Sequence, residues 1–536
     1  MKNHPFSHTT LLIAVAFLLL IVPLSSGSGV VLAKEAVDFP YATTITVNST
    51  DDPDTSKSKT CETDTPCTLR RAIVQARLAP DRPVLIQFDI PDSDPGYDSA
   101  LKIWKIEVQS TSDPSVFRTL EGGQITIDGS TQPGGRAEGP KIIIVGPSTG
   151  SKDGLIVGAN AAGGHDGNTI RGLGFQNFKN HVIVNSNDNI IEDNWFGLSD
   201  DGTEPYLRND DPQDGSGSSG VALSAGVTGN TIRNNVFLGF DGVAAALRGD
   251  ANTFADNYVG TAADGTVPNK QTDPSLICTT VDWLGGGGIS MEGNDHVITN
   301  NVFAGLRQEI FSLSTQPDAI RLIGTGHRIE DNQIGFDGDG NKVGVCGRGI
   351  YFSDGPKEVQ ATDNAIVDSG MSGISLNGAL YNENTLRGNT IEKSEAWPHI
   401  QGNPKGEDAI QIGPSLPDAF EAFKPAQVTE IDGTAVSGTS GENSACPNCV
   451  VEVFLDDTDA ITETLQSLAV VTADASGNWS AALPFELSAG QGLRTTSTSA
   501  QYNTIPGMKA GTTTGLSVLY TGVGSDYKIY LPLVIR

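Results

Sequence analysis

The amino-acid sequence predicts an all-β protein whose main part is a right-handed parallel β-helix, a single-stranded solenoid. Three observations lead to this fold class. A short phrase recurs eight times between about residues 122 and 413, apolar residues alternate within it, and no segment of helical periodicity separates the copies. The phrase is an Asn or His, an alternating apolar pair, an inward Asn and a second apolar pair. Its copies begin at Asn168, Asn189, Asn230, Asn252, His296, His327, Val359 and Asn384.

A second phrase precedes most copies of the first. After a Gly or Ala, apolar residues alternate over about four positions, as in Gly220–Leu223, Gly242–Ala245 and Gly349–Phe352. Such alternation predicts a strand, and the Gly, Asn and Asp residues between the phrases predict tight turns. Each coil therefore contains at least two short strands and spans roughly 21–25 residues, with loops inserted into some coils.

The sixth position of the first phrase is Asn in seven of the eight copies, and Leu173 is the exception. A buried amide needs hydrogen-bond partners, and equivalent positions of stacked coils lie about 4.8 Å apart. We therefore expect these side chains to form a structural ladder along an inner corner; the alternative is that they only mark surface turns. The expected ladder consists of Asn194, Asn235, Asn257, Asn301, Asn332, Asn364 and Asn389.

Composition and charge limit the classes of partner. The chain has 536 residues, 63 of them Gly, few aromatic residues, and a formal net charge of −30 at pH 7. Abundant Gly and sparse aromatic residues are typical of a turn-rich β solenoid. The negative charge argues against nucleic acid and anionic membranes as partners, and it permits metal cations.

The first 33 residues have the organisation of a signal peptide. Lys2 supplies a positive charge, Leu11–Leu24 is apolar, and the small residues of Val31–Ala33 precede the expected cleavage site. The apolar run is shorter than a membrane span. We expect a secreted or cell-surface protein with no membrane span in the mature chain.

In a secreted protein, the six Cys residues predict disulfides. The Cys446–Cys449 pair has no second Cys pair or His pair nearby to complete a zinc site. A strand follows it, where a thioredoxin-type motif would have a helix. Pairing by neighbourhood joins Cys61 with Cys67, Cys446 with Cys449, and Cys278 with Cys346.

Residues 61–73, C-E-T-D-T-P-C-T-L-R-R-A-I, predict the start of a helix. Thr68 can act as the N-cap, and Arg71 stands where a capping box has Glu. The apolar side of the helix consists of Leu69, Ala72, Ile73 and Ala76. Because a solenoid exposes an apolar cross-section at each end, we expect this helix to cover the N-terminal one. The segment resembles the CSLREA-type motif of secreted bacterial β-helix proteins with a pectin-lyase-like fold.

This resemblance continues in I-T-I-D-G-S-T-Q-P-G at 125–134 and in three Asp-Gly turns at 196–203, 259–266 and 334–341. Together these segments cover most of residues 43–413. The resemblance implies the architecture and no particular activity, because members of this group mostly have no assigned reaction.

After Pro425 the pattern changes to short alternating strands at intervals of roughly 12–18 residues, which predict a small β-sandwich. This segment resembles bacterial immunoglobulin-like domains. The tail Tyr527–Arg536 resembles the ends of other secreted bacterial proteins, and it is either a sorting signal or a final edge strand. The expected parts are a signal peptide (1–33), an N-terminal cap (34–121), the β-helix (122–425), the Ig-like sandwich (426–522) and the tail (523–536).

Candidate site residues lie on loops inserted after the second strand of successive coils, where they are expected to line up as a wall beside a groove. The acidic candidates for catalysis are Asp200, Asp201, Asp211, Asp264, Asp337 and Asp339. The candidates for stacking on a glycan are Trp283, Trp397 and His399. Asp337, Asp339 and Asn341 are the candidate ligands of Ca²⁺, although the distal Glu of a calcium loop is missing.

Two functions fit this pattern. Asp and Gly are also the ordinary residues of turns, and the catalytic signatures of pectate lyases, polygalacturonases and mannuronan epimerases are absent from the sequence. We therefore expect a non-catalytic surface protein that binds an extracellular polysaccharide or a cell-surface component. The alternative is a polysaccharide lyase or glycoside hydrolase, and no cofactor other than Ca²⁺ is implied.

Overall fold

The computed structural model describes residues 41–53, 58–110, 112–147, 151–159, 164–206, 218–240, 242–268, 286–306, 317–377, 383–394, 409–413, 423–441, 446–459, 461–500 and 509–521. The predicted signal peptide and the predicted tail lie outside these residues.

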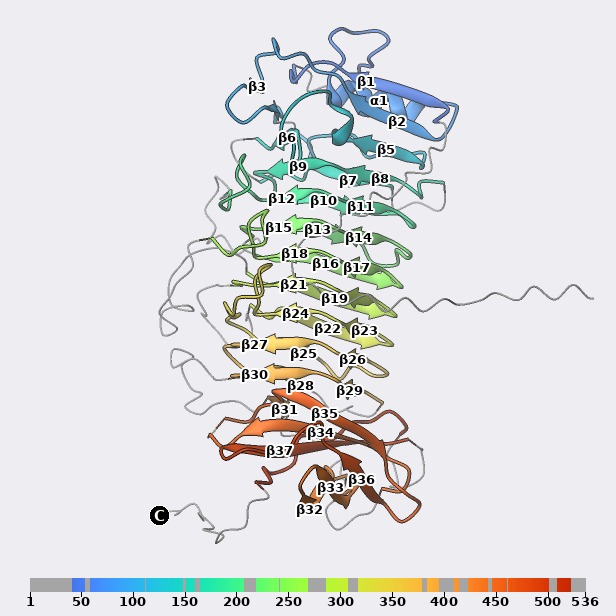
Figure 1. Ribbon diagram of the computed structural model, residues 1–536. Coiled ribbons are helices and arrows are strands. Elements are labelled where there is room, and N and C mark those ends of the chain that lie inside the picture. Colours follow the sequence, from blue (N-terminus) through green and yellow to red (C-terminus); the bar gives the residue numbers. More distant parts are fainter. Residues whose placement is uncertain are drawn as a thin grey trace, which may run out of the picture. The chain divides into compact units, whose positions relative to one another are not determined.

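The described chain from Tyr41 onward is built around three long sheets, and from Ile125 onward each coil contributes one strand to each of them (Figure 1). Neighbouring strands within each sheet are parallel and come from successive coils, apart from one short antiparallel pair at the start of the second sheet. The predicted parallel β-helix is thus confirmed, with three strands in a coil where the sequence predicted at least two.

The strands of the three sheets are short. The first sheet contains β1 (Thr43–Val47), β2 (Val84–Phe88), β5 (Ile125–Asp128), β8 (Thr169–Arg171), β11 (Ile190–Glu192), β14 (Thr231–Arg233), β17 (Thr253–Ala255), β20 (Val297–Thr299), β23 (Arg328–Glu330), β26 (Gln360–Thr362) and β29 (Thr385–Arg387). The second contains β3 (Tyr97–Asp98), β4 (Ile103–Glu107), β6 (Ile142–Val145), β9 (Leu173–Gln176), β12 (Trp195–Phe196), β15 (Val236–Phe237), β18 (Tyr258–Val259), β21 (Val302–Phe303), β24 (Gln333–Ile334), β27 (Ala365–Val367) and β30 (Thr390–Glu392). The third contains β7 (Leu155–Val157), β10 (Asn180–Val184), β13 (Ser219–Leu223), β16 (Val243–Asp250), β19 (Ile289–Asn294), β22 (Ile320–Thr325), β25 (Ile350–Phe352), β28 (Ile374–Leu376) and β31 (Ile410–Ile412).

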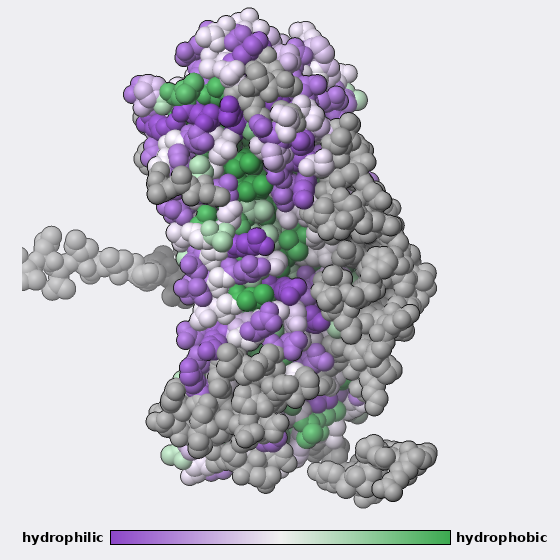
Figure 2. All heavy atoms as spheres, turned by 180° about the vertical axis from the view of Figure 1, so that it is seen from behind, coloured by the Kyte–Doolittle hydropathy of each residue, from purple (hydrophilic) through white to green (hydrophobic). Residues whose placement is uncertain are grey.

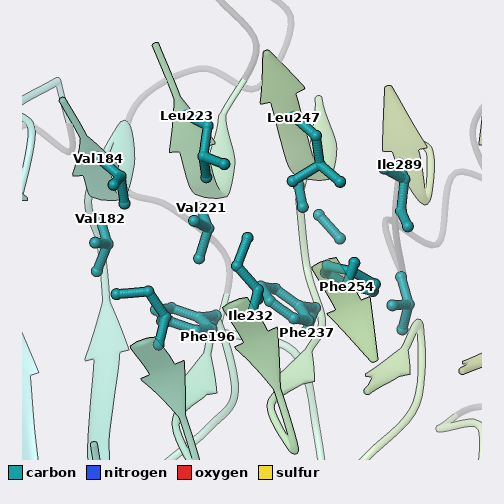
Figure 3. Packing of buried hydrophobic residues seen from close by; sticks show 14 of the residues in the cluster. Val182, Val184, Phe196, Val221, Leu223, Ile232, Phe237, Leu247, Phe254 and Ile289 are labelled. Atoms are coloured by element: carbon teal, nitrogen blue, oxygen red, sulfur yellow. The ribbon is translucent and has the colours of Figure 1, made fainter. Parts of the chain in front are cut away.

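The core runs along the inside of the coils. Figure 3 shows side chains of the third sheet, such as Val221 and Leu223, pointing towards Ile232 of the first sheet and Phe237 of the second. Phe196 and Phe237 stack on successive coils with ring centroids 4.9 Å apart. Stacking equivalent residues coil upon coil gives one continuous apolar column, which explains why the inward positions repeat so strictly.

The sixth-position Asn residues form a ladder at the corner between the first and second sheets. The Nδ2 of each Asn donates to the Oδ1 of the next at 2.9–3.1 Å, and its backbone N–H donates to the same oxygen. Leu173, which stands where the other copies have Asn, donates its backbone N–H to Oδ1 of Asn194 at 3.1 Å. The corner residue ahead of most of these Asn has a positive φ of 54–58° and is Asn or Asp, the types that best tolerate that conformation.

A second ladder, which the sequence reasoning missed, uses the first position of the same phrase. Asn168, Asn189, Asn230 and Asn252 are buried and joined by Nδ2–Oδ1 bonds of 2.8–3.0 Å. His296 then takes the place of Asn: its Nδ1 accepts the N–H of Asn252 at 3.2 Å.

His327 occupies the next rung, and its ring lies parallel to that of His296 with centroids 5.2 Å apart. Its Nδ1 accepts the N–H of His296 at 3.2 Å. Burial, together with the neighbouring His296, lowers the pKa of His327 to about 4, and burial also lowers the pKa of His296. Both rings therefore stay neutral at pH 7, which leaves Nδ1 free to accept, as an Asn oxygen does.

Asn301→Leu is expected to lower the free energy of unfolding by about 1–3 kcal/mol, because it leaves buried partners without their hydrogen bonds. Asn301 gives and receives bonds with Asn257 above and Asn332 below. The measurement is the midpoint of thermal or denaturant unfolding. Gln333→Leu, at an exposed position on the adjacent coil, is the control; equal midpoints for the two variants would contradict a stabilising ladder.

Helix α1 (Leu69–Leu78) packs on β1 and β2 at the start of the stack. Thr68 caps it by accepting the N–H of Arg71, and the predicted apolar face is buried. Arg71, in the place of the Glu of a capping box, donates to the carbonyl of Pro66. Cys61 and Cys67 are joined by a disulfide just before the helix.

The β-helix begins earlier than the predicted boundary at residue 122, because β1 and β2 already belong to the first sheet. These first coils lack the Asn phrase, so the repeat in the sequence does not extend to them. A second correction concerns register: Ala244–Leu247, two residues after the predicted Gly242–Ala245, aligns with Gly220–Leu223. The short run of Ala residues made this phrase ambiguous.

The C-terminal part is a β-sandwich of two three-stranded antiparallel sheets. Their strands are β32 (Gln427–Asp432), β33 (Ala435–Thr439), β36 (Asn478–Ala482), β35 (Gln466–Thr472), β34 (Val450–Asp457) and β37 (Gln491–Thr498). Trp479 is buried between them, with Nε1 donating to the carbonyl of Thr439 at 2.9 Å. The closer resemblance to an Ig-like domain stays a prediction, because this arrangement is common to several sandwich folds.

The sandwich is attached to the last described coils by backbone hydrogen bonds. Ile391 of β30 and Thr464 exchange N–H···O bonds of 2.9 and 3.0 Å, and both carboxylate oxygens of Glu452 accept the N–H of Gly388. These contacts satisfy backbone groups of the final coil that no further coil can pair. The sandwich therefore closes the C-terminal end of the solenoid, as α1 closes the N-terminal end.

Candidate functional site

Where a coil carries an inserted loop, the loop begins at the corner between the second and third sheets, as predicted (Figure 1). The longest described parts of these insertions are the three Asp-Gly turns that follow β12, β18 and β24. Their acidic residues were the leading catalytic candidates, so the contacts of each carboxylate decide what it can do.

Asp201 and Asp264 each close their own turn. Oδ1 of Asp201 accepts from the hydroxyls of Ser199 and Thr203 at 2.7 and 2.8 Å, and Oδ1 of Asp264 accepts from the hydroxyl of Thr266 at 2.7 Å. These hydrogen bonds hold the pKa of both carboxyl groups below the usual value. Such groups are poor proton donors at neutral pH.

Asp200 and Asp337 are also engaged. Asp200 forms an ion pair of 2.8 Å with Lys105 and accepts from Gln176 Nε2 at 3.0 Å. Asp337 is buried, and its two oxygens accept from the side-chain amide of Asn341 at 3.0–3.1 Å. Asp339 is exposed and donates its N–H to Asp337. The predicted calcium ligands therefore bond to one another within a turn.

The turns lie on the outer face of the second sheet. The N–H of Ala263 donates to Gly202, and the N–H of Gly338 donates to Gly265, so the three turns stack on one another. A Cβ on Gly265 would approach the Cα of Gly338 to 2.9 Å, so this stacking requires glycine. Apolar residues of the turns and of the sheet below form a small separate cluster: Leu198, Val236, Leu238, Val267, Ala304 and Val343. The described parts of the loops that were predicted to form a wall beside a groove therefore pack on the outer face of the second sheet.

Several predicted residues lie outside the described part of the chain: Asp211, Trp283, Trp397, His399 and Cys278. Cys346 is buried and disulfide-bonded, and its pairing with Cys278 stays a prediction. Cys446 and Cys449 are joined by a disulfide at the edge of the sandwich.

One group of three carboxylates among the described residues is close enough to share a cation: Asp456, Asp457 and Glu463 in the sandwich. Asp456 is paired with Arg494, and Glu463 accepts the N–H of Lys393 from the last coil at 2.7 Å. Burial raises the pKa of Glu463 to about 7. These contacts make the group part of the junction between the sandwich and the solenoid.

The outer face of the third sheet carries the most distinctive surface chemistry. Figure 2 shows this face, where apolar residues gather along the upper part of the stack and polar residues interrupt them further down. In the register of the sheet, one outward position per coil forms a column: Ile156, Ile183, Ala222, Ala246, Ser290, Arg321, Tyr351, Ser375 and Gln411. Its N-terminal half is apolar and its C-terminal half is polar.

The polar half is organised around Tyr351. The guanidinium carbon of Arg348 lies 3.8 Å from the centroid of its ring, and that of Arg321 lies 5.9 Å away. Asn377 Nδ2 donates to the Tyr351 hydroxyl at 3.0 Å. Asp318 is buried and pairs with Arg348 at 3.1 Å. Two cations are therefore fixed against one aromatic ring on the outer face of the sheet, where Arg348 is buried and Arg321 and Tyr351 are partly exposed.

This cluster offers hydrogen-bond donors and a ring, and its described acidic side chains are already paired. Cleavage of a glycosidic bond by two carboxyl groups requires them to flank the bond at a defined separation. Near the cluster, Asp318 pairs with Arg348, and Glu292 pairs with Arg248 at 3.3 Å. The arrangement is suited to binding polar ligands.

Arg321 and Tyr351 were not among the site residues predicted from the sequence. The available signal was the outward position of the second phrase, which reads Ser, Arg, Tyr and Ser on four successive coils. A residue between two inward positions of a strand points to the outer face of the sheet, and Ser290, Arg321 and Tyr351 are partly exposed there.

None of the described helices is long and apolar enough to span a membrane. A scan against protein-family models finds no match, and a search of curated proteins finds none either.

Among solved structures, the chain is similar to the Dettilon tailspike protein, with 12% identity, coverage of 85% of this chain and 79% of that one, and a TM-score of 0.33. It is also similar to the tailspike protein of E. coli bacteriophage HK620 in complex with pentasaccharide, with 13% identity, coverage of 77% and 80%, and a TM-score of 0.25. A third is DFA-IIIase from Arthrobacter chlorophenolicus A6 in complex with GF2, with 11% identity, coverage of 70% and 82%, and a TM-score of 0.30.

Proposed function

We propose that this protein is secreted or held at the cell surface, and that it binds an extracellular polysaccharide along the outer face of the third sheet without cleaving it. The observation that carries the proposal is the cluster of Arg321, Tyr351 and Arg348 on the outer face of a parallel sheet, where Arg321 and Tyr351 are partly exposed. The N-terminal signal sequence and the cysteines support an extracellular location.

An extended polymer fits this face better than a small ligand. Equivalent side chains of neighbouring coils repeat about every 4.8 Å, so a chain lying along the column meets a new side chain on each coil. From Ser290 to Gln411 these side chains are hydroxyl, guanidinium, phenol, hydroxyl and amide groups. Ser375 is buried and donates to Gln411 Oε1 at 3.1 Å, and the other four are partly exposed groups that can donate hydrogen bonds to the oxygen atoms of sugars.

The contacts of the acidic candidates support binding without catalysis. Asp201 and Asp264 close turns, and Asp200 forms an ion pair with Lys105. Beside Tyr351, Asp318 is paired with Arg348. A carboxyl group engaged in this way is not free to protonate a leaving group.

Tyr351→Ala is expected to weaken retention on the bound polysaccharide about tenfold, a typical loss when an aromatic anchor is removed. The measurement is affinity electrophoresis of the mature protein in gels that contain neutral or acidic polysaccharides. Tyr41→Ala, whose hydroxyl lies against Thr126 beside the first sheet, is the matched control and should migrate like the wild type.

Two results would contradict the proposal. Equal retention of the Tyr351 and Tyr41 variants would move the site away from the third sheet. New reducing or unsaturated ends, produced with turnover from any polysaccharide of the panel, would show that the protein is an enzyme.

A further inference from the structure

We infer that the polysaccharide carries isolated carboxylates among neutral sugars, and that Arg321 binds one of these carboxylates. This inference rests on the proposed function and adds the chemical class of the ligand. It starts from the charges on the outer face of the third sheet.

Three described arginines lie on or beside this face, and they differ in their partners. Arg248 pairs with Glu292 at 3.3 Å, and Arg348 pairs with Asp318 at 3.1 Å. Arg321 has no carboxylate partner among the described residues; its Nη2 donates only to the hydroxyl of Ser353, at 3.4 Å. Of these three arginines, Arg321 is therefore the one whose charge is left for a ligand to neutralise.

The position of Arg321 suits an anionic ligand. Its guanidinium lies beside the ring of Tyr351 and is only partly exposed, and its Nε is buried without a hydrogen-bond partner. Packing against the ring reduces the freedom that the side chain would lose on binding. A guanidinium can bind a carboxylate through two parallel hydrogen bonds, which makes it more selective for planar anions than lysine.

The neighbours of Arg321 limit the charge density of the ligand. On the column, Ser290 lies one coil before it, and Tyr351, Ser375 and Gln411 follow on the next three coils, so one cation serves five coils. A polymer with a carboxylate on every sugar would place most of its charges opposite neutral groups and would be repelled by the net charge. A heteropolysaccharide with one uronate among neutral sugars fits the face better.

The test compares Arg321→Gln with Arg248→Gln in the full mature chain. Retention is measured on low-acyl gellan, whose repeating unit contains a single glucuronate, and on the same gellan after reduction of its carboxyl groups. Polygalacturonate and dextran sulfate are the densely charged probes, and dextran is the neutral one. Binding of free glucuronate is followed by NMR shifts.

We expect the wild type to bind gellan at least about tenfold more tightly than its carboxyl-reduced form, and more tightly than either densely charged polymer. Arg321→Gln should remove this tenfold preference and the NMR shifts caused by glucuronate. Arg321→Lys should keep part of the preference and part of the shifts. Arg248→Gln should leave the preference and the shifts unchanged. Dextran sulfate bound better than gellan would assign a sulfate ligand and overturn the inference.

The inference is also overturned if the wild type binds neither gellan nor glucuronate, or if Arg321→Gln leaves the preference intact. Retention of neutral dextran that depends on Tyr351 and not on Arg321 would overturn the acidic ligand while leaving the proposed function in place. Retention that depends on neither Tyr351 nor Arg321 would overturn both the acidic ligand and the proposed binding face.

Discussion

Asp52→Ala is expected to lower the free energy of unfolding by about 3–5 kcal/mol, because it leaves a buried guanidinium without its counter-ion. Both Asp52 and Arg70 are almost fully buried, and Arg70 Nε donates to Asp52 Oδ1 at 2.6 Å. Arg70 also donates to the carbonyls of Val116 and Gln109, so one side chain joins α1 to two later segments. Loss of the Asp52–Arg70 ion pair should therefore destabilise the whole N-terminal end of the solenoid.

The measurement is the unfolding midpoint of the variant against that of Asp51→Ala, the exposed neighbour. The double variant Asp52→Leu, Arg70→Met should recover a large part of the loss, because it removes both charges together. A double variant less stable than Asp52→Ala alone would contradict this account and would assign the main role to the carbonyl contacts of Arg70.

Ile73→Asp is expected to lower the free energy of unfolding by about 2–5 kcal/mol. Ile73 is fully buried on the face of α1 that covers the first coils, and an Asp there would place an unpaired carboxylate against the apolar end of the core. The protein would have to expose this end or protonate the new carboxyl group, and both are costly.

Leu78→Asp is the matched control for this substitution, since Leu78 lies at the end of the same helix with 68% of its surface exposed. Its unfolding midpoint should remain close to that of the wild type. Equal effects of the two substitutions would show that helix propensity matters here and that covering the core does not.

The architecture was accessible from sequence because a solenoid repeats its local rules. Every coil needs inward apolar residues and a corner that accepts a positive φ, so the same residue types return at the same positions. The first coils, β1 and β2, were assigned to a cap because they use other corner residues. In the sequence, the first position of the phrase is a mixture of Asn and His and does not suggest a ladder. In the structure, the neutral rings of His296 and His327 accept backbone N–H groups as the Asn side chains do.

The candidate site was much less accessible. Sequence reasoning selected acidic residues on inserted loops, since loops often carry function, but Asp201 and Asp264 use their carboxylates to close turns. It passed over Arg321 because the outward position of a strand does not tell a paired arginine from an unpaired one. Only its lack of a partner, beside the paired Arg248 and Arg348, distinguishes it.

The solenoid, the Asn corner, the capping helix and the β-rich C-terminal part were all predictable from the sequence, because each depends on contacts between residues that are close in the chain or repeated along it. Three features became visible only in the folded molecule: the Asp-Gly turns cover the second sheet, the sandwich closes the last coil through Thr464 and Glu452, and Arg321 is left without a counter-ion. Those features depend on which side chains meet across coils and insertions of unequal length, and a one-dimensional pattern does not record such distances.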